Sequence, residues 1–518
     1  MVSQLAAALL LAASLGGDGL PVQAPRTVGM SAERLAAIDR VISRGITAGG
    51  YPGAAVVVGR KGAAVWQKGF GRLGWGKESD RVTPERTVYD LASLTKVVAT
   101  TTALMILYDE GKIQLDAPVS QYLPAFAGGW RDSVTVRQLL EHRGGLPAGR
   151  DLWRVARTPE EARLMVLATE LECRPGYCYI YSDIGADLLG FIVEEVAGTT
   201  LETFATDRIF APLGMTDTFF RPADTLKYRV APTEVTPPRG YPLRGEVHDE
   251  NAWALGGVAG HAGLFSTAND LSIFAQMMLN GGEFNGVRIL ADSTVTMFTR
   301  RAAGTRALGW DTADADGGPS GDGGSGEYLS ERAYGHTGYT GTSLWIDPDR
   351  QMFVLLLTNR VHAARARRPS KVISDVRADL ADAAALAVVD YEDGVLAMPA
   401  SFRADRAVGW NRPAYVKRRG KQAKRRGVKA AKSKRAVSGR NARKKTYVSS
   451  RGAVAKAGKA AKPGKAGKAI KGRQSGIKSG VRKPTAKAGV KTGAKAGAKA
   501  AKPRAPSWPK PATSRRPD

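Results

Sequence analysis

The sequence predicts an α+β fold, with one lobe built on a central antiparallel sheet flanked by helices and a second lobe that is mostly helical. Two β-hairpin patterns lie near opposite ends of the first 400 residues, a helical pattern accompanies each hairpin, and the chain between them is mostly helical. Strands in consecutive hairpins form an antiparallel sheet whose faces neighbouring helices can cover. The two halves of the predicted sheet therefore come from distant parts of the chain.

The first hairpin follows a helical stretch that begins at Ser31 and carries apolar residues at helical spacing. Apolar runs at residues 54–58 and 63–67 then flank GRKG, a sequence typical of a hairpin turn. A second pair of runs spans residues 342–359 around PDRQ, and a helical pattern follows at residues 370–389. Each predicted hairpin thus has a helix of its own.

The helical lobe is expected to occupy roughly residues 95–250, inserted in a domain that spans residues 25–400. Its first helix, at residues 93–110, is apolar nearly all round, and a helix without a polar face is a buried one. Thr267, with Asp270 three residues later, is a variant of the capping box and predicts the start of another helix.

Residues 1–24 are expected to be a secretory signal peptide, with an apolar run at residues 5–15 and the small-residue end VQA at residues 22–24. No Lys or Arg precedes the apolar run, so a buried or membrane-anchoring N-terminal helix is the alternative. The run is too short to cross a bilayer comfortably, and no later segment reaches that length. We therefore expect an exported, periplasmic or extracellular protein without a stable transmembrane span.

Residues 401–518 form a basic tail that accounts for the whole positive charge of the chain. The tail holds 38 Lys and Arg against 2 acidic residues, whereas residues 1–400 carry a net charge of −7. Lys, Ala, Gly and Pro dominate it, and such a composition cannot bury enough apolar surface to offset the entropy of ordering. We expect this tail to be disordered and to attract polyanions through counterion release, either anionic envelope polymers or nucleic acid.

Only two cysteines occur, Cys173 and Cys178, on either side of RPGY. In an oxidising compartment they could close a small loop, and in a reducing one they would be free thiols. They fit no zinc pattern because no paired His or Cys lies nearby at ligand spacing.

The sequence SLTK at residues 93–96 is a candidate catalytic element. A serine hydroxyl needs a nearby base to act as a nucleophile, and a lysine three residues later on a helix lies on the same face. The tail also contains two S-x-x-K sequences, at residues 475–478 and 507–510, but only Ser93 opens an apolar helix. There the helix dipole favours a nucleophile, and an apolar setting would depress the pKa of Lys96. The alternative is a capping serine followed by a solvated lysine.

The sequence YSD at residues 181–183 supplies Tyr181, whose phenol can relay a proton if cations such as Lys96 lower its pKa. By itself, a tyrosine in the run YCYIY more often packs in a core. The pattern is therefore informative only in combination with Ser93 and Lys96.

The sequence HTG at residues 336–338 precedes the strand expected from Thr342 onward. Gly338 permits close approach of a substrate backbone, and the amide of Tyr339 can join that of Ser93 in an oxyanion hole. Residues 311–326, rich in Gly, Asp and Ser, predict a mobile loop just before His336, where a lid or specificity loop could lie.

These three elements, in this order, resemble those of the serine β-lactamase and penicillin-binding-protein-like superfamily, in particular its class C and esterase-like branch. The resemblance covers roughly residues 31–390. Five further stretches look like that branch, namely YPGA (51–54), GKIQLD (111–116), VTVRQLLEH (134–142), GHAGLFST (260–267) and GYTGT (338–342). It implies a β-lactamase/transpeptidase-like fold with the active cleft between the two lobes.

Position by position, the resemblance implies that Ser93 is the acylated serine, Lys96 its partner and Tyr181 the tyrosine of the Y-x-N element. His336 replaces the lysine usual in true lactamases, and Asp183 stands where that element usually has Asn. An ionised Asp183 can only accept hydrogen bonds, whereas Asn donates one to a substrate carbonyl. Asp183, together with Thr337 and Gly338, is expected to contact substrate.

Asp183 also bears on the choice of base. A carboxylate within reach of Lys96 would hold that lysine charged, so we expect Tyr181 rather than Lys96 to be the acylation base. The other four histidines, His142, His248, His261 and His362, are expected to be hydrogen-bonded structural residues, and the chain is expected to bind neither metal nor cofactor.

The leading functional prediction is a serine acyl hydrolase that acts through acyl-Ser93 on an ester or on a D-amino-acid peptide of the cell wall, as an esterase or a D-alanyl-D-alanine carboxypeptidase does. A true class C-type β-lactamase is the alternative, which His336 and Asp183 disfavour. A third prediction, from another class, is a polyanion-binding protein whose basic tail is the working part.

Overall fold

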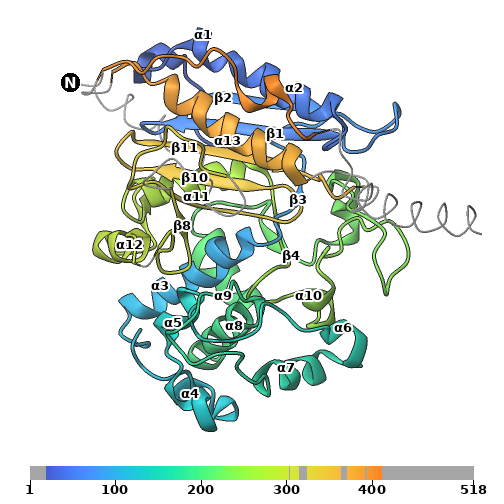
Figure 1. The fold of residues 1–518 in the computed structure, drawn as a ribbon, viewed down its shortest axis with the longest axis vertical. Helices are drawn as coiled ribbons and strands as arrows, with labels where there is room; N and C mark the ends of the chain where they lie inside the picture. The colour runs from blue at the N-terminus through green and yellow to red at the C-terminus, as the bar shows by residue number, and fades with distance from the viewer. Residues whose placement is uncertain (1–18, 303, 314–323, 363–369, 391–393, 411–518) are drawn as a thin grey trace, which may run out of the picture. The chain divides into compact units, whose positions relative to one another are not determined.

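The computed structural model describes residues 19–302, 304–313, 324–362, 370–390 and 394–410. Its centre is a six-stranded antiparallel sheet with the strand order β2-β1-β11-β10-β9-β8 (Figure 1). The strands are β1 (Gly53–Arg60), β2 (Ala63–Gly71), β8 (Asp311–Thr312), β9 (Tyr334–Thr337), β10 (Ser343–Asp347) and β11 (Met352–Thr358). Strand β1 pairs with β11, so the two predicted hairpins form one sheet from distant parts of the chain.

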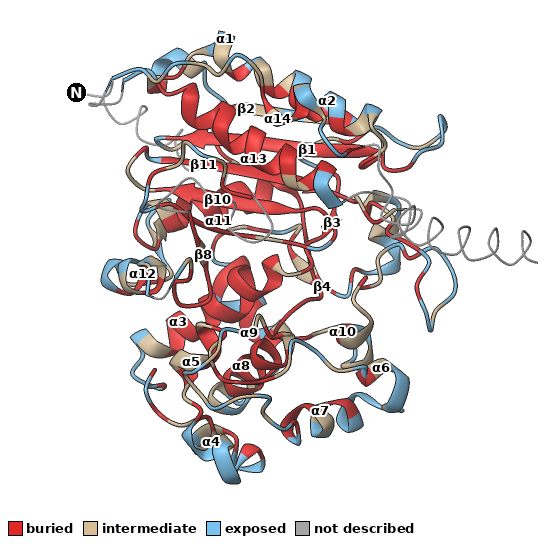
Figure 2. Cartoon of the chain, in the orientation of Figure 1, coloured by how far each residue is buried: buried red, intermediate tan, exposed pale blue. Residues whose placement is uncertain are grey.

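Helices cover both faces of this sheet, and successive side chains of β1 alternate between them. Val56 and Val58 pack with α2 (Ala37–Thr47) and α13 (Ser370–Leu386), whereas Ala55 and Val57 belong to the larger core on the opposite face. Helix α11 (Ala268–Leu279) contacts β1, β10 and β11 on that opposite face. The sheet is therefore buried on both sides, as Figure 2 shows.

The remaining helical and short elements lie mainly between the two hairpins in sequence. The helices are α1 (Ala32–Leu35), α3 (Thr102–Asp109), α4 (Val119–Tyr122), α5 (Val136–Leu140), α6 (Leu152–Val155), α7 (Pro159–Leu167), α8 (Asp183–Ala197), α9 (Leu201–Ala205), α10 (Glu250–Ala254), α12 (Asp292–Thr299) and α14 (Arg403–Arg406). The 3-10 segments are Pro25–Val28, Pro124–Phe126, Gly129–Ser133 and Asp224–Arg229, and the π-helical ones are Lys96–Thr101 and Thr206–Phe210. Two small sheets consist of β3 (Tyr89–Asp90), β5 (Leu264–Ser266) and β4 (Phe219–Phe220), and of β6 (Glu283–Phe284) and β7 (Val287–Arg288).

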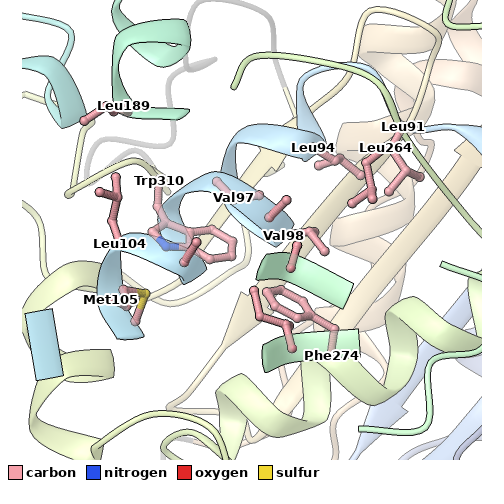
Figure 3. Packing of buried hydrophobic residues seen from close by; sticks show 14 of the residues in the cluster. Leu91, Leu94, Val97, Val98, Leu104, Met105, Leu189, Leu264, Phe274 and Trp310 are labelled. Atoms are coloured by element: carbon pink, nitrogen blue, oxygen red, sulfur yellow. The ribbon is translucent and has the colours of Figure 1, made fainter. Parts of the chain in front are cut away.

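The helix expected at residues 93–110 is buried, as predicted, but its first half is π-helical from Lys96 to Thr101 and becomes α-helical only in α3. Its apolar side chains Leu94, Val97 and Val98 are fully buried in the main core (Figure 3). π-helical turns are rare and occur frequently at functional sites. The segment that carries Lys96 is therefore both rigidly packed and irregular.

The helix start predicted at Thr267 is confirmed, because the Thr267 side chain accepts a hydrogen bond from the Asp270 amide. Residues 336–338 precede the strand β10, as predicted, but His336 itself lies inside β9, a strand that the sequence analysis did not predict. The sequence of β9 is too short and polar to signal a strand, and its pairing is decided by β10, where Leu344 lies opposite His336. The first two residues of the predicted loop at 311–326 form β8, and residues 314–323 lie outside the described residues.

The folded part extends past the predicted start of the tail at residue 401. Phe402, Ala404 and Trp410 are buried, and Arg403 pairs with Asp379 and Asp382 of α13. The boundary differs because Phe402 and Trp410 are large apolar side chains that the average composition of the tail conceals. Residues 411–518 lie outside the described residues.

At the other end, the described chain begins inside the predicted signal peptide. Leu20 is buried, and the Gln23 amide donates a hydrogen bond to the Ala64 carbonyl of β2. Cleavage after Ala24 remains a prediction. None of the helices in the described ranges is long and apolar enough to cross a membrane.

Candidate active site

Ser93 follows a tight turn at the end of β3. Ala92 adopts a left-handed backbone conformation with φ 48°, and its amide donates a 2.8 Å hydrogen bond to Asp90 Oδ1. A residue with a Cβ pays a conformational cost in this region, so the surrounding structure has to impose it. The turn places Ser93 at the start of the buried helical segment, as the sequence predicted.

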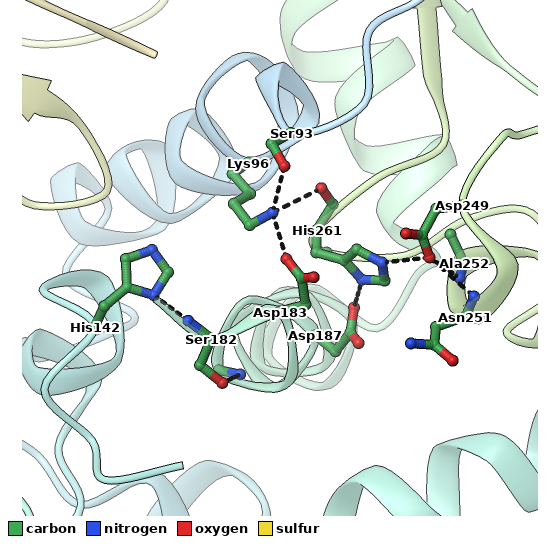
Figure 4. Close-up of polar contacts among 12 residues, drawn as sticks. Ser93, Lys96, His142, Ser182, Asp183, Asp187, Asp249, Asn251, Ala252 and His261 are labelled. Atoms are coloured by element: carbon green, nitrogen blue, oxygen red, sulfur yellow. Dashed lines mark hydrogen bonds and ion pairs between the residues drawn. The ribbon is translucent and has the colours of Figure 1, made fainter. Parts of the chain in front are cut away.

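The Lys96 ammonium lies against three acceptors, which Figure 4 shows together. Its Nζ is 2.9 Å from Ser93 Oγ, 3.1 Å from the His261 carbonyl oxygen and 2.8 Å from Asp183 Oδ1. Burial by itself would lower the pKa of Lys96, but Asp183 and then Tyr181 outweigh burial and raise it above its usual value. An ammonium group has three N–H donors, and this one has an acceptor for each. Lys96 is therefore a charged donor with no lone pair to act as a base.

Tyr181 lies between two cations and two imidazole rings. Its ring centroid is 5.0 Å from Lys96 Nζ and 5.9 Å from the Arg306 guanidinium carbon. The ring centroids of His142 and His336 lie 4.4 and 6.0 Å away. Cations this close to an aromatic face are attracted to it. The phenol thus sits where positive charge can stabilise negative charge on its oxygen.

His142 holds the segment that carries Tyr181. Its Nδ1 accepts a 3.1 Å hydrogen bond from the Ser182 amide, and its carbonyl oxygen accepts one of 3.0 Å from the Ile180 amide. Ser182 in turn caps α8, because its Oγ accepts from the Gly185 amide. The start of α8 therefore fixes Tyr181 and Asp183 together.

His336 is buried and uncharged at neutral pH. Its Nδ1 donates a 2.8 Å hydrogen bond to the Thr337 carbonyl, which leaves Nε2 as an acceptor, and no described residue forms a hydrogen bond with that buried atom. Burial lowers the pKa of His336 to about 4, although Asp311, whose Oδ2 is 3.9 Å from Nε2, acts in the opposite direction. His336 therefore supplies no positive charge to the site at neutral pH.

The turn between β9 and β10 is fastened directly to the residues that precede Ser93. Thr340 Oγ1 donates a 2.8 Å hydrogen bond to the Asp90 carbonyl, and Thr342 Oγ1 donates one of 2.9 Å to the Leu91 carbonyl. A Cβ at Gly338 would overlap both the Leu91 carbonyl oxygen and Thr342 Oγ1, so only glycine fits. The turn that carries Tyr339 is thus held against the residues that lead into Ser93, and the oxyanion hole of the Ser93 and Tyr339 amides stays a prediction.

A cavity of about 1310 Å³ opens at these residues. Six of the eight predicted site residues line it: Ser93, Tyr181, His336, Thr337, Gly338 and Tyr339. It continues past Trp345 to α13 and α14. Lys96 and Asp183 are not among the lining residues, so in this structure Asp183 contacts Lys96 rather than the open cavity.

The sequence did not predict three residues of the site. Arg306 was not identified at all, and His142 and His261 were given only structural roles. Arg306 comes from an irregular loop and has no motif around it. His142 and His261 were expected to be structural, yet His142 supports Tyr181 and the carbonyl of His261 binds Lys96. No signal in a single sequence separates these histidines from ordinary buried ones.

Cys173 and Cys178 form a disulfide with a Cα–Cα distance of 6.6 Å, which decides between the two alternatives left open by the sequence. The loop that they close precedes Tyr179, which lines the cavity. Across the described ranges, no group of three or more His, Cys, Asp or Glu side chains is arranged to hold a metal ion.

Comparisons with known proteins agree with this arrangement. A model of the beta-lactamase family matches residues 38–377. A protein of Escherichia coli K12 named "Putative D-alanyl-D-alanine carboxypeptidase" is 35% identical over 397 residues, covering 68% of this chain and 89% of the relative. A Salmonella schwarzengrund protein of the same name is 36% identical over 384 residues, covering 66% and 87%.

Solved structures show the same fold at lower identity. An octameric penicillin-binding protein homologue from Pyrococcus abyssi has a TM-score of 0.52 at 23% identity, with 65% of this chain and 75% of that chain covered. A class C beta lactamase from Rhodobacter sphaeroides has a TM-score of 0.53 at 21% identity, with 66% and 97% covered. The chain belongs to the beta-lactamase family, and within it this chain is a serine acyl hydrolase.

Proposed function

We propose that this hydrolase removes the terminal residue from peptides that end in D-amino acids, through an acyl intermediate on Ser93. The observation that carries the proposal is the contact of 2.9 Å between Ser93 Oγ and Lys96 Nζ at the wall of the cavity. The two relatives at 35% and 36% identity, both named as carboxypeptidases of this specificity, support the choice of substrate.

In the acylation step, Ser93 Oγ attacks the carbonyl carbon of the scissile peptide bond, and its proton passes to Tyr181. Tyr181 takes this proton as a phenolate, and Lys96 and Arg306, the two cations that face its ring, stabilise the phenolate before the transfer. The carbonyl oxygen takes the charge of the tetrahedral intermediate and accepts hydrogen bonds from the Ser93 and Tyr339 amides. Tyr181 then protonates the leaving nitrogen, and the C–N bond breaks.

Deacylation repeats these steps with water. Tyr181 takes a proton from the water molecule as its oxygen bonds to the acyl carbon, and returns a proton to Ser93 Oγ as the ester bond breaks. Lys96 stays charged throughout, because its three acceptors favour the ammonium form. The nitrogen of an ammonium group has no lone pair and cannot act as a base.

The two departures from the family's usual residues support a substrate other than a β-lactam. Asp183 is occupied by Lys96 and, when ionised, cannot donate a hydrogen bond to a substrate carbonyl. His336, uncharged near neutral pH, cannot attract a substrate carboxylate as lysine would, so the carboxylate of a D-Ala-D-Ala peptide requires another cation, and Arg360 and Lys371 both line the cavity. We therefore expect weak β-lactamase activity.

The location and the tail belong to the same proposal. A cell-wall substrate requires export, and a polycationic tail would hold the enzyme near anionic envelope polymers. Nucleic acid is the competing partner for the tail. Cell fractionation separates these two alternatives, because envelope binding predicts recovery in the periplasmic or extracellular fraction.

The test compares three substrates with the purified protein: an acylated peptide that ends in D-Ala-D-Ala, a short-chain nitrophenyl ester and a chromogenic cephalosporin. We expect release of D-Ala, hydrolysis of the more labile ester, and little reaction with the cephalosporin. Ser93→Ala should lose all turnover while remaining folded. Turnover retained by Ser93→Ala would refute the mechanism, and ester turnover without D-Ala release would refute the substrate.

A further inference from the structure

His261 lies next to Lys96, with both ring nitrogens facing carboxylates (Figure 4). Its Nδ1 is 2.6 Å from Asp187 Oδ1, and its Nε2 is 3.0 Å from Asp249 Oδ1. The His261 ring is 2% exposed. Ionised carboxylates only accept hydrogen bonds, so satisfying both contacts requires both ring nitrogens to carry a proton. The geometry is that of an imidazolium held between two carboxylates.

The charges around His261 favour this state. Burial lowers its pKa, but the carboxylates of Asp187, Asp249 and Asp183 together raise it well above the usual value. Burial acts in the opposite sense on Asp187, whose pKa it raises, so His261 and Asp187 titrate as a pair across their 2.6 Å contact. The other charged or titratable groups nearby are the Lys96 ammonium, which binds the His261 carbonyl, His248, which acts on Asp249, and Asp90, on which both His248 and Asp249 act.

The two carboxylates belong to different elements. Asp187 lies on α8, one turn after Asp183, while Asp249 caps α10 by accepting hydrogen bonds of 2.9 Å from the Asn251 and Ala252 amides. The His261 ring therefore connects α8 to the start of α10. Both contacts meet at a single side chain.

The backbone at residues 260–261 carries this connection to the nucleophile. The His261 carbonyl accepts a 3.1 Å hydrogen bond from Lys96, and the Gly260 carbonyl accepts one of 2.7 Å from Thr100 on the same helical segment. A Cβ at Gly260 would overlap the Ala186 carbonyl of α8, so the two backbones are in close contact. A shift of the His261 ring would therefore displace the carbonyl that orients Lys96.

We propose that His261 is a positioning residue whose doubly protonated ring ties α8 to α10 and so presents its own carbonyl as the third acceptor of Lys96. Lys96 Nζ is thereby held at Ser93 Oγ. A neutral ring can donate to only one of the two carboxylates and is repelled by the other, so loss of its proton loosens the arrangement. The inference rests on the proposed role of Ser93 and Lys96.

The test measures the rate at which a fluorophosphonate labels Ser93 as a function of pH, because this reaction needs no knowledge of the substrate. Asp187→Asn keeps an acceptor for His261 but removes the charge that favours its protonation. We expect the alkaline fall in labelling to move at least one pH unit lower in this variant. His261→Gln, which cannot donate to both carboxylates, should label at least ten-fold more slowly than the wild type at pH 7.

Asp270→Asn is the matched control. It removes an equally buried carboxylate, whose partners are the Thr218 hydroxyl and the Asp217 amide, away from Lys96. Its pH profile should coincide with that of the wild type. Misfolding lowers the amount of labelled protein but does not change the pH at which labelling falls. The pH of that fall therefore tests the role of His261 even if His261→Gln folds poorly.

An unmoved limb in Asp187→Asn overturns the role of His261, and so does an equal movement in Asp270→Asn. Absence of Ser93 labelling in the wild type would instead overturn the proposed function, so the two failures are distinguishable.

Discussion

Replacing Asp183 with Asn removes one negative charge from the surroundings of Lys96 and leaves an amide oxygen able to accept its hydrogen bond. In the wild type the two groups are 2.8 Å apart, and the lysine side chain is 4% exposed. An opposite charge at such a distance typically shifts a pKa by about 1–3 units. Asp183 raises the pKa of His261 as well as that of Lys96. If activity needs both groups protonated, the alkaline limb of the pH profile should lie about one to three pH units lower in Asp183→Asn than in the wild type.

The same substitution should cost stability. The pKa of Lys96 in the folded protein lies above its usual value of 10.5, so its charged form stabilises the fold at neutral pH. This contribution disappears only as the pH rises through the folded-state pKa. Hydrogen bonds to charged groups contribute about 1.5–3 kcal/mol. We expect a loss of that order in urea unfolding at pH 7.

The assay is kcat/KM for a nitrophenyl ester between pH 6 and 11, together with the rate of reaction with a chromogenic cephalosporin. The amide introduced by Asp183→Asn would also bring an N–H that can donate to a substrate carbonyl, so the cephalosporin rate should rise relative to the ester rate. Asp116→Asn, which breaks an ion pair with Arg137 at 2.6 Å on the surface, is the control. An unchanged alkaline limb and an unchanged ratio of the two rates would refute both the charged state of Lys96 and the acceptor role of Asp183.

Three further predictions follow from the geometry. Gly338→Ala should lower kcat for the ester by at least ten-fold, because the added Cβ overlaps the Leu91 carbonyl, and a wild-type rate would contradict the close packing of this turn. Arg306→Gln, which removes a cation 5.9 Å from the Tyr181 ring, should slow labelling of Ser93 at least ten-fold, whereas the exposed Arg300→Gln should not. His336 has a folded-state pKa of about 4 against a usual value of 6.5, so the unfolded state binds its proton first and stability falls as the pH drops from 6.5 to 4. Urea unfolding at both pH values should show about 3 kcal/mol less pH dependence in His336→Gln than in the wild type, and equal dependence would contradict a buried, neutral His336.

The charge arrangement explains how the site can keep the acyl-serine chemistry of its family while changing two of its usual residues. Asp183 holds Lys96 in its charged state, and Lys96 with Arg306 provides positive charge at Tyr181. His336 adds no further charge because burial keeps it neutral. The positive field at Tyr181 therefore comes from Lys96 and from a residue, Arg306, that lies outside the three motifs.

The sequence by itself determined the α+β architecture, both main hairpins and the order of the catalytic elements, because these depend on local patterns. Alternating apolar residues specify strands, the apolar run after Ser93 specifies a buried helix, and Thr267 with Asp270 specifies a helix start. Such signals lie within a few residues of one another.

Only the tertiary structure decided which distant groups meet. The three acceptors of Lys96 come from residues 93, 183 and 261, and Arg306 reaches Tyr181 from a loop without any pattern. The charge states of Lys96 and His336 also depend on such contacts between distant residues, because burial and neighbouring charges shift the pKa of a side chain from its usual value. Strand β9, too, exists only because β10 pairs with it.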